Sequence, residues 1–319
     1  MKRIKILVLT AGSSPAIGVI KSLMGQTEIP VHIIAADSDA YSAGFILSQE
    51  KLIVPEFSNK NFIDLLLKYS IKNNIQYIFP PVLNNGLILL SKKKDLFEQN
   101  DIKIFISNYS SVLKTIDKRI TLKICAKEKI KIPRTFNNIR DIRRNDFPLI
   151  IKPSIGLGSK NVWKINDYND LEYLSKKVKK PIIQQYIEAD EFTIDVLNTE
   201  KNAFLTAVPR IRLKIKNGQS FQGKIVNDLQ LVGYAKHLSK IFKLSGPANI
   251  QVFKKNGEIL LIEVNPKFGA GSILTFENGV NIPLLLIKMN LGMKISKKEI
   301  APRTGVVMSR YLEEAYFNE

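Results

Sequence analysis

The chain has 319 residues, with 48 basic and 29 acidic side chains and a formal net charge of +19 at pH 7. This length predicts two or three domains around a large core. No apolar run approaches the roughly 18 residues that a membrane span requires. The short apolar run near the N-terminus continues into a strand-turn-helix pattern instead of a signal-peptide cleavage site. We therefore expect a cytoplasmic protein without a membrane partner.

The positive charge is carried mostly by lysine and is spread along the chain, whereas base recognition depends on arginine geometry. We therefore expect no specific nucleic-acid partner, while small anionic ligands such as nucleotides remain open. A single cysteine, Cys125, excludes a disulfide within the chain, and two distant histidines, His32 and His237, give little support to a histidine-based metal site or triad. Cys125 lies in an expected helix and is interpreted as a small core residue.

The first hundred residues alternate apolar runs with helical patterns. Strands are expected at residues 4–10, 31–36, 77–79 and 103–107. One helix is expected to begin near Pro15, with Ser13 or Ser14 as its N-cap, and another to span 61–73. This alternation predicts an open parallel sheet that binds ligands at the carboxyl ends of its strands. The turn from Gly12 to Gly18 lacks the spacing of a dinucleotide fingerprint, so a tight strand-to-helix turn is favoured there.

A glycine-containing loop between two expected strands is a candidate for phosphate binding. The strand at 147–153 contains Lys152, and the loop after it contains Gly156, Gly158, Ser159 and Lys160. Glycines let backbone N–H groups approach a phosphate, and the lysines supply positive charge. The alternative interpretation is an ordinary hairpin loop.

The rest of the chain is expected to be richer in strands. Strands are predicted at 182–187, 191–197 and 204–208, and helices at 117–129, 168–178, 227–242 and 282–289. Arg210, Arg212 and Lys214 alternate along the chain, so their side chains share one face of a strand. Residues 217–224 are predicted to form a mobile loop.

The stretch from Gly257 to Gly271 contains a buried strand that ends in polar residues. Glu263 and Asn265 interrupt its apolar run, and they lie on one face of the strand because side chains alternate. A carboxylate and an amide oxygen are the oxygen ligands that Mg²⁺ prefers. The alternative is a strand end that is simply exposed to water.

A preceding run that contains Asn249 and Gln251 is expected to form a hairpin with this strand, through a turn at Asn256-Gly257. A three-residue loop would place Asn249 opposite Glu263 and Gln251 on the same face. A two-residue turn would place Gln251 opposite Ile262, away from Glu263. We predict the three-residue loop, because only that register gathers the potential metal ligands.

These features in this order resemble the ATP-grasp superfamily, in particular its branch similar to the large chain of carbamoyl-phosphate synthase, as a single ATP-grasp unit. The resemblance covers essentially the whole chain and rests on the Lys152 strand, the glycine loop and the run Glu263-Val264-Asn265-Pro266-Lys267. It implies an α/β and α+β chain with a Rossmann-like parallel-sheet domain at 1–112. An ATP-grasp lid subdomain at 113–186 and a C-terminal subdomain with an antiparallel sheet at 187–319 would follow.

The resemblance also implies roles for individual residues. Cations at the phosphates would be Lys118 and Lys152, closed over by Gly156, Gly158 and Ser159. Adenine would meet Gln184, Gln185 and Ile187, and the ribose would meet Glu191. Ligands of one or two Mg²⁺ ions, or of Mn²⁺, would be Gln251, Glu263 and Asn265. The transferred phosphate or a substrate carboxylate would be held by the cations Arg210, Arg212 and Lys267. Lys267 stands where this branch usually has arginine, and Gln251 stands where many other branches have aspartate.

The function implied by this resemblance is ATP-dependent ligation of a carboxylate to an amine or ammonia, through an acyl phosphate. A nucleotide-binding protein of the same fold without ligase activity is the main alternative, and an NAD-dependent enzyme with Asp37 as the ribose ligand is a weaker one. The partners would be small-molecule carboxylates and amines, with a homodimer also compatible. The sequence does not name either substrate, because substrate contacts come from variable loops.

Overall fold

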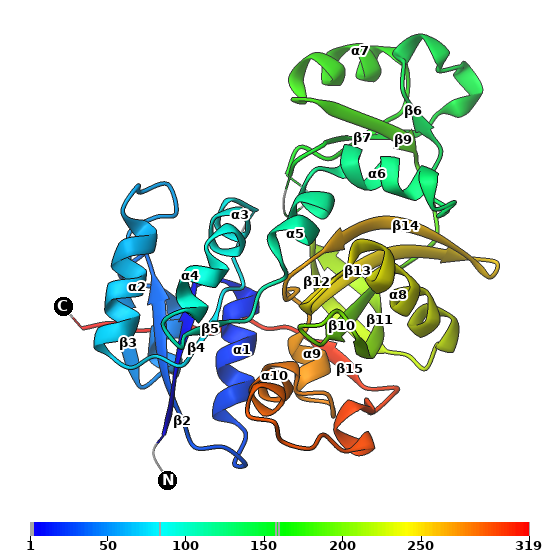
Figure 1. Cartoon of the computed structure of the whole chain (residues 1–319). Helices are drawn as coiled ribbons and strands as arrows, with labels where there is room; N and C mark the ends of the chain where they lie inside the picture. Colours follow the sequence, from blue (N-terminus) through cyan, green and yellow to red (C-terminus); the bar gives the residue numbers. More distant parts are fainter. Residues whose placement is uncertain (1–2, 83, 157, 159, 319) are drawn as a thin grey trace.

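The computed structural model describes residues 3–82, 84–156, 158 and 160–318, and these residues form three β-sheets in succession along the chain (Figure 1). The first sheet is parallel, with the strand order β3-β2-β1-β4-β5. Its strands are Ile4–Leu9 (β1), Val31–Asp37 (β2), Glu50–Ile53 (β3), Tyr77–Phe79 (β4) and Lys103–Ile104 (β5). The open parallel sheet predicted from the sequence is therefore confirmed.

Apolar side chains of β1 enter two cores, one on each face of this sheet. Ile6 and Val8 belong to one buried cluster, whereas Leu7 and Leu9 belong to another, as the alternation of side chains along a strand requires. The connecting helices are Ser14–Met24 (α1), Ala43–Leu47 (η1, a 3₁₀ helix), Phe62–Lys72 (α2), Asn84–Lys92 (α3) and Lys94–Glu98 (α4). Ser13 caps α1 by accepting a hydrogen bond from the Ala16 N–H, as predicted.

Two helices, Tyr109–Ile116 (α5) and Lys118–Lys127 (α6), lead from the first sheet to a smaller antiparallel sheet of order β6-β9-β7-β8. Its elements are Thr135–Phe136 (β6), Ile139–Asp141 (η2), Arg144–Asp146 (η3), Leu149–Pro153 (β7), Trp163–Ile165 (β8), Tyr168–Lys177 (α7) and Pro181–Gln185 (β9). This part has its own buried cluster, in which Leu149 and Ile151 pack with Leu171 of α7. Figure 1 shows it standing apart from the parallel sheet, and we call it the lid.

The third sheet is antiparallel and has the order β14-β13-β10-β11-β12-β15. Its strands are Asp190–Asn198 (β10), Phe204–Lys216 (β11), Gln219–Ile225 (β12), Gly246–Lys255 (β13), Glu258–Asn265 (β14) and Val307–Ser309 (β15). Helix Leu229–Phe242 (α8) covers one face. Helices Ile273–Phe276 (α9) and Ile282–Asn290 (α10) contact α1 of the first domain, and Lys297–Ile300 (η4) follows them. The mixture of one parallel and two antiparallel sheets agrees with the predicted fold class.

The mobile loop predicted at 217–224 is wrong, because most of this segment is strand β12. The strand pairs with β11 on one side and with β15 on the other. Asn217 and Gly218 both have positive φ angles, 49° and 72°, and form the two-residue turn between β11 and β12. The Asn-Gly pair was therefore a hairpin signal, and the polar side chains after it lie on a strand near the edge of the sheet.

The predicted three-residue loop between β13 and β14 is also wrong. Lys255 pairs with Glu258, so Asn256 and Gly257 form a two-residue turn with φ angles of 50° and 78°. The register then shifts between Gln251 and Val252, and this shift leaves Ile262 as an extra residue on β14. Because of this bulge, Gln251 pairs directly with Glu263 and Asn249 with Asn265, so the tight turn does not separate the potential metal ligands.

Candidate functional site

A cavity of about 1210 Å³ lies where the lid, the third sheet and the first domain meet. Its walls contain most of the side chains that the sequence suggested. They are Lys118, Lys152, Gly156, Gly158, Gln184, Gln185, Ile187, Glu191, Arg212, Gln251, Glu263, Asn265 and Lys267. Ser159 lies outside the described residues. Elements far apart in sequence therefore build one site.

The β13–β14 hairpin forms the polar wall of this cavity. The Asn265 side-chain N–H₂ donates to Glu263 Oε1 at 2.8 Å and to Asn249 Oδ1 at 3.3 Å. Because of the bulge, the consecutive residues Ile262 and Glu263 both line the cavity. Glu263 keeps 26% of its side chain exposed, so its carboxylate remains accessible to a ligand.

Two lysines face this wall from different elements. Lys118 is the first residue of α6, and its Nζ lies 3.8 Å from Glu263 Oε2. Its backbone N–H donates to the Ser154 carbonyl at 2.9 Å, which ties α6 to the end of β7, where Lys152 lies. Burial lowers the pKa of Lys152 to about 8, while Glu263 opposes the shift and Lys118 adds to it. An anion between the two ammonium groups would relieve this cost of burial.

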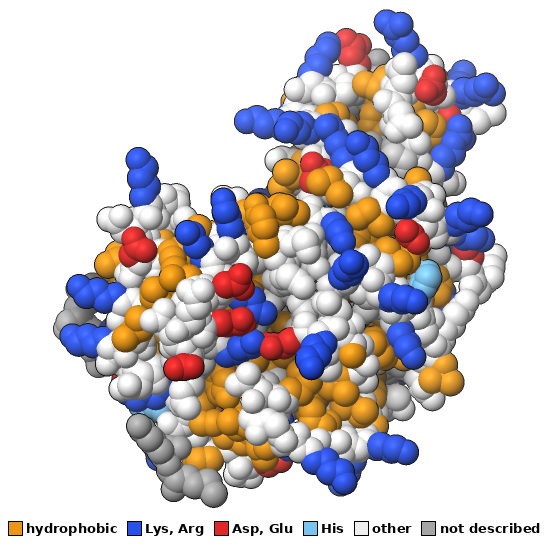
Figure 2. Space-filling model, viewed as in Figure 1, with side chains coloured by type: hydrophobic (Ala, Val, Ile, Leu, Met, Phe, Trp, Pro, Cys, Tyr) orange, Lys and Arg blue, Asp and Glu red, His pale blue; other side chains and the backbone are white. Residues whose placement is uncertain are grey.

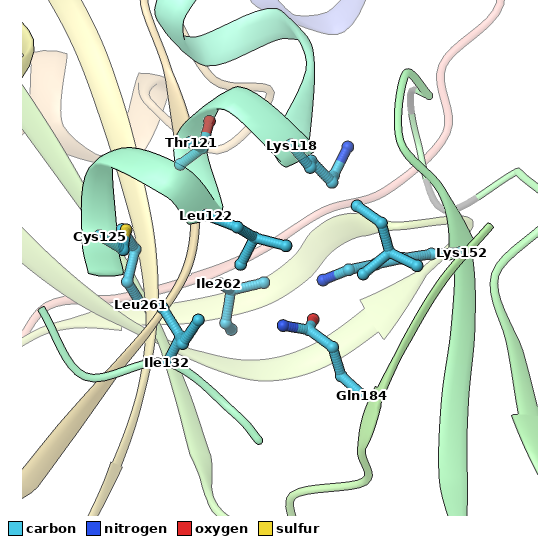
Figure 3. Close-up of a pocket in the computed structure, with 10 residues that line it drawn as sticks. Lys118, Thr121, Leu122, Cys125, Ile132, Lys152, Gln184, Leu261 and Ile262 are labelled. Carbon is cyan, nitrogen blue, oxygen red and sulfur yellow. The ribbon is translucent and has the colours of Figure 1, made fainter. Parts of the chain in front are cut away.

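A small cavity of about 10 Å³ lies directly behind this site, large enough for roughly one water molecule. Figure 3 shows Lys152 and Gln184 pointing into the space beside Ile262, with Cys125 on the opposite side. The Cys125 thiol is fully buried, and burial raises its pKa to about 11. The interpretation of Cys125 as a core residue is confirmed, because a thiol this hard to ionise is a poor nucleophile.

The orientation of the Gln184 amide is fixed by the lid. Its Nε2 donates to Thr135 Oγ1 at 2.9 Å and to the Pro133 carbonyl at 3.4 Å. Because a carbonyl only accepts hydrogen bonds, the amide nitrogen must face Pro133, and Oε1 has no hydrogen-bond partner among the described residues. Gln184 therefore offers an acceptor to a ligand in the cavity.

Arg212 and Glu191 both line the cavity, and they form an ion pair with each other. Arg212 Nη1 donates to Glu191 Oε1 and lies 3.5 Å from Gln251 Oε1. Its Nη2 donates to the Gly218 carbonyl at 2.7 Å and its Nε to Ser220 Oγ at 3.1 Å. These contacts hold the guanidinium at the wall.

The structure places Arg210 beneath the cavity wall and does not bring it together with the other predicted site residues. Its side chain is 1% exposed and forms a two-point ion pair with Asp195, at 2.7 and 2.9 Å. Ser272 Oγ and Thr275 Oγ1 also donate to Asp195, at 2.6 and 2.5 Å. Arg210 does not line the cavity, because its ion pair with Asp195 holds the guanidinium beneath the cavity wall. The Arg210–Asp195 pair there supports the loop before α9.

Two family descriptions match consecutive parts of the chain. Residues 6–105 match the PylC-like N-terminal domain, and residues 177–315 match a family described as ATP-grasp in the biosynthetic pathway with Ter operon. The second match includes the strands that carry Glu191, Arg212, Gln251 and Glu263. Residues 177–315 of the chain are therefore similar to an ATP-grasp family.

Curated relatives are similar to parts of this chain. The D-alanine–D-alanine ligase of Fusobacterium nucleatum is 31% identical over 166 residues, which cover 49% of this chain and 57% of the relative. The carbamoyl phosphate synthase large chain of a Thermoanaerobacter species is 26% identical over 229 residues, 65% of this chain and 21% of the relative. The chain therefore spans a little over half of the first relative and about a fifth of the second.

A solved structure shows the same fold over a larger share of the chain. The biotin carboxylase of Campylobacter jejuni, in complex with an ATP analogue, superposes with a TM-score of 0.73 at 13% identity. The match covers 94% of this chain and 74% of that protein. Among the described residues, no helix combines the length and the apolar character that crossing a membrane requires.

The donor set of this site is compatible with a magnesium ion that is also bound by phosphate oxygens of a ligand. The hairpin supplies a single carboxylate, Glu263, and the amide side chains of Gln251 and Asn265 lie on the same wall. No cluster of three or more acidic, histidine or cysteine side chains suited to a metal occurs among the described residues. Mg²⁺ is commonly held by one or two carboxylates together with substrate phosphates. The residues present fit that arrangement.

Several cavity residues were not found by sequence reasoning. The β1–α1 turn contributes Gly12 to Pro15, although its spacing argued against a dinucleotide site, and Pro81 follows β4. Only the proximity of the first domain to the third sheet reveals these residues, and Lys267 Nζ lies 3.4 Å from the Val82 carbonyl of the first domain. Asn249, which the sequence placed only in the hairpin, donates to the Lys267 carbonyl at 2.9 Å and so fixes the start of the glycine loop after β14.

Proposed function

We propose that this chain is an ATP-dependent ligase that joins a carboxylate to an amine or ammonia. The observation that carries the proposal is the convergence of Lys118, Lys152 and Glu263 on one cavity wall between the lid and the third sheet. Two lysines and a carboxylate on a strand suit a nucleotide triphosphate with its metal ion. The relatives named D-alanine–D-alanine ligase and carbamoyl phosphate synthase support this choice of reaction class.

The positions of the residues support the following roles. Lys118 and Lys152 would hold the phosphates together with the backbone at Gly156 and Gly158. Gln184, Gln185 and Ile187 would face adenine, with Gln184 Oε1 accepting a hydrogen bond from its amino group. The Glu191 carboxylate would bind the ribose hydroxyls in place of its ion-pair partner Arg212. Glu263, Asn265 and Gln251 would hold Mg²⁺, or Mn²⁺, which neutralises phosphate charge.

The reaction would proceed in two steps. A substrate carboxylate oxygen attacks the γ-phosphorus, the bond to the β-phosphate oxygen breaks, and ADP leaves. The amine then attacks the acyl carbon, phosphate leaves with the bonding electrons, and the amine loses a proton. Lys267 and Arg212 would stabilise the negative charge on the transferred phosphoryl group. The protein supplies position and charge, so the reaction needs no cysteine or histidine nucleophile.

The first test is thermal unfolding of the wild type, Glu263→Ala and the control Glu258→Ala, with and without Mg-ATP. Glu258 is exposed on the same strand, and among the described residues its carboxylate forms an ion pair only with Lys131. A ligand that binds the folded state at a hundredfold excess over its Kd adds about 2.7 kcal/mol to the free energy of unfolding. We expect this stabilisation in the wild type and in the control, and its loss in Glu263→Ala.

Ligase activity is tested by ADP release with pools of carboxylates and amines. We expect ADP only when both a carboxylate and an amine are present. ADP release that is equal with and without these substrates would contradict the ligase assignment and favour a nucleotide-binding protein without ligation. Absence of any Mg-ATP stabilisation in the wild type would contradict the nucleotide site itself.

A further inference from the structure

The walls of the cavity are far more basic than the chain as a whole. Eight cationic side chains and two carboxylates line it, whereas the whole chain has 48 basic and 29 acidic residues. A background of lysine-rich composition alone would give a ratio near that of the chain. The cavity therefore concentrates positive charge, and a cavity with walls of one sign attracts ligands of the other sign.

The excess of positive charge in the cavity walls lies mainly on the lid. Lys160, Lys177, Lys179 and Lys180 line the cavity from the lid, and none of them has an acidic partner within ion-pair distance in the described part of the chain. Figure 2 shows blue side chains gathered on the lid, where it overhangs the rest of the molecule. Like charges that crowd at one rim repel each other, so this arrangement is stabilised by an anion.

The backbone of the lid lysines is anchored beside the cavity. The Lys180 carbonyl accepts a hydrogen bond from the Ser154 N–H at 3.1 Å, directly after the strand that carries Lys152. Lys177 Nζ lies 5.5 Å from the ring centres of both Trp163 and Tyr173. The Lys180 contact holds the backbone of the basic rim beside the cavity, whereas the Lys177 ammonium lies beside two rings that do not line it.

Mg-ATP leaves a large part of this charge uncompensated. A triphosphate carries about four negative charges, and Mg²⁺ offsets two of them. Glu191 is already paired with Arg212, and Glu263 is needed for the metal. After both carboxylates and one Mg-ATP are counted, about four positive charges remain without a counter-charge.

The cavity also has space for a second ligand. Its volume of about 1210 Å³ exceeds the roughly 300–1,000 Å³ that is common for a small-molecule site. Beyond the nucleotide-facing walls, it is lined by the β1–α1 turn, by Gln219 and by the small residues Gly269 and Ala270. This second part of the cavity contributes no acidic side chain to the walls among the described residues.

We propose that the carboxylate substrate of this enzyme carries two or more negative charges, as a di- or tricarboxylate or a phosphorylated acid does. This inference rests on the proposed ligase function and specifies its substrate class. The lid lysines would bind the additional charge, while the reacting carboxylate lies near Lys267. A substrate with a single charge would leave the basic rim without a partner.

The test measures binding to protein saturated with a non-hydrolysable ATP analogue and Mg²⁺, by titration calorimetry. The probes are tricarballylate, which has three carboxylates, and butyrate, which has one. The variants are the double change Lys179→Ala with Lys180→Ala, and the matched control Arg140→Ala with Arg144→Ala. The control removes the same charge from exposed lid positions that do not line the cavity.

We expect tricarballylate to bind at least tenfold more tightly than butyrate. The lysine variant should lose at least tenfold of that affinity while its Kd for the nucleotide analogue changes by less than threefold, and the control variant should behave as the wild type. Equal affinity of the wild type for the two probes would overturn the inference. An equal loss of affinity for tricarballylate and for the nucleotide analogue in the lysine variant would also overturn it. A wild type that does not bind the nucleotide analogue would overturn the proposed function as well, which separates the two failures.

Discussion

The depressed pKa of Lys152 predicts how nucleotide binding depends on pH. Burial holds the pKa near 8 in the free protein, and only the charged ammonium group stabilises a phosphate. Above pH 8 the charged fraction falls about tenfold for each pH unit, which corresponds to about 1.4 kcal/mol of binding free energy. The affinity for an Mg-ATP analogue should therefore be nearly constant from pH 6.5 to 7.5 and about tenfold weaker at pH 9.

Titration calorimetry in buffers with different ionisation enthalpies measures both the affinity and the proton uptake on binding. We expect close to one proton to be taken up at pH 9, because the bound phosphate restores the charge on Lys152. Lys152→Arg is the control, since arginine stays charged and should bind with little pH dependence. Burial also lowers the pKa of Lys267, so Lys267→Arg is measured in parallel. A flat profile in the wild type would refute the reasoning.

The effect of Lys152 on the free energy of unfolding should have the opposite pH dependence to its effect on nucleotide affinity. The folded protein releases the Lys152 proton near pH 8, whereas the unfolded chain retains it until about pH 10.4. The unfolded state therefore binds more protons in this window, and the contribution of Lys152 to the free energy of unfolding should rise with pH between those values.

Three further predictions test other parts of the site. Gln184→Met removes the acceptor in the cavity, so the affinity for Mg-ATP should fall about fivefold and the preference over Mg-GTP should shrink, as measured by displacement of a fluorescent nucleotide. Asp195→Ala leaves Arg210 buried without its ion-pair partner, so the free energy of unfolding measured in urea should fall by about 3–5 kcal/mol. A decrease below about 1 kcal/mol would contradict this prediction. An equal decrease in the control variant Asp190→Ala, at an exposed position, would also contradict it. Cys125 should react with a disulfide reagent on the order of several hundredfold more slowly in the native protein than in guanidinium chloride.

Much of the fold was determined by local sequence patterns. The alternation of apolar strands and helices predicted the parallel sheet, because each strand buried on both faces leaves a continuous apolar run such as residues 6–9. Ser13 and Pro15 placed the start of α1. Glu263 and Asn265, two residues apart on a strand, had to share a face, and the structure places both in the cavity wall.

Other features depended on contacts between distant segments. Strand β12 looks like a polar loop in sequence, and it becomes a strand because β11 and β15 pair with it on both sides. Arg210 and Arg212 have the same alternation in sequence, yet Asp195 buries the first and Glu191 holds the second at the cavity. No local pattern distinguishes the two arginines.

The cavity itself is a product of tertiary structure. The bulge at Ile262 corrected the register that the two-residue turn would have imposed, and its position depends on the pairing of β13 with β14. The first domain contributes Gly12 to Pro15 only because α10 and α9 pack against α1. The sequence by itself determined which chemical groups were available and on which strands they lay. The packing of three sheets decided which of those groups face the same space, because that depends on contacts between residues more than a hundred positions apart.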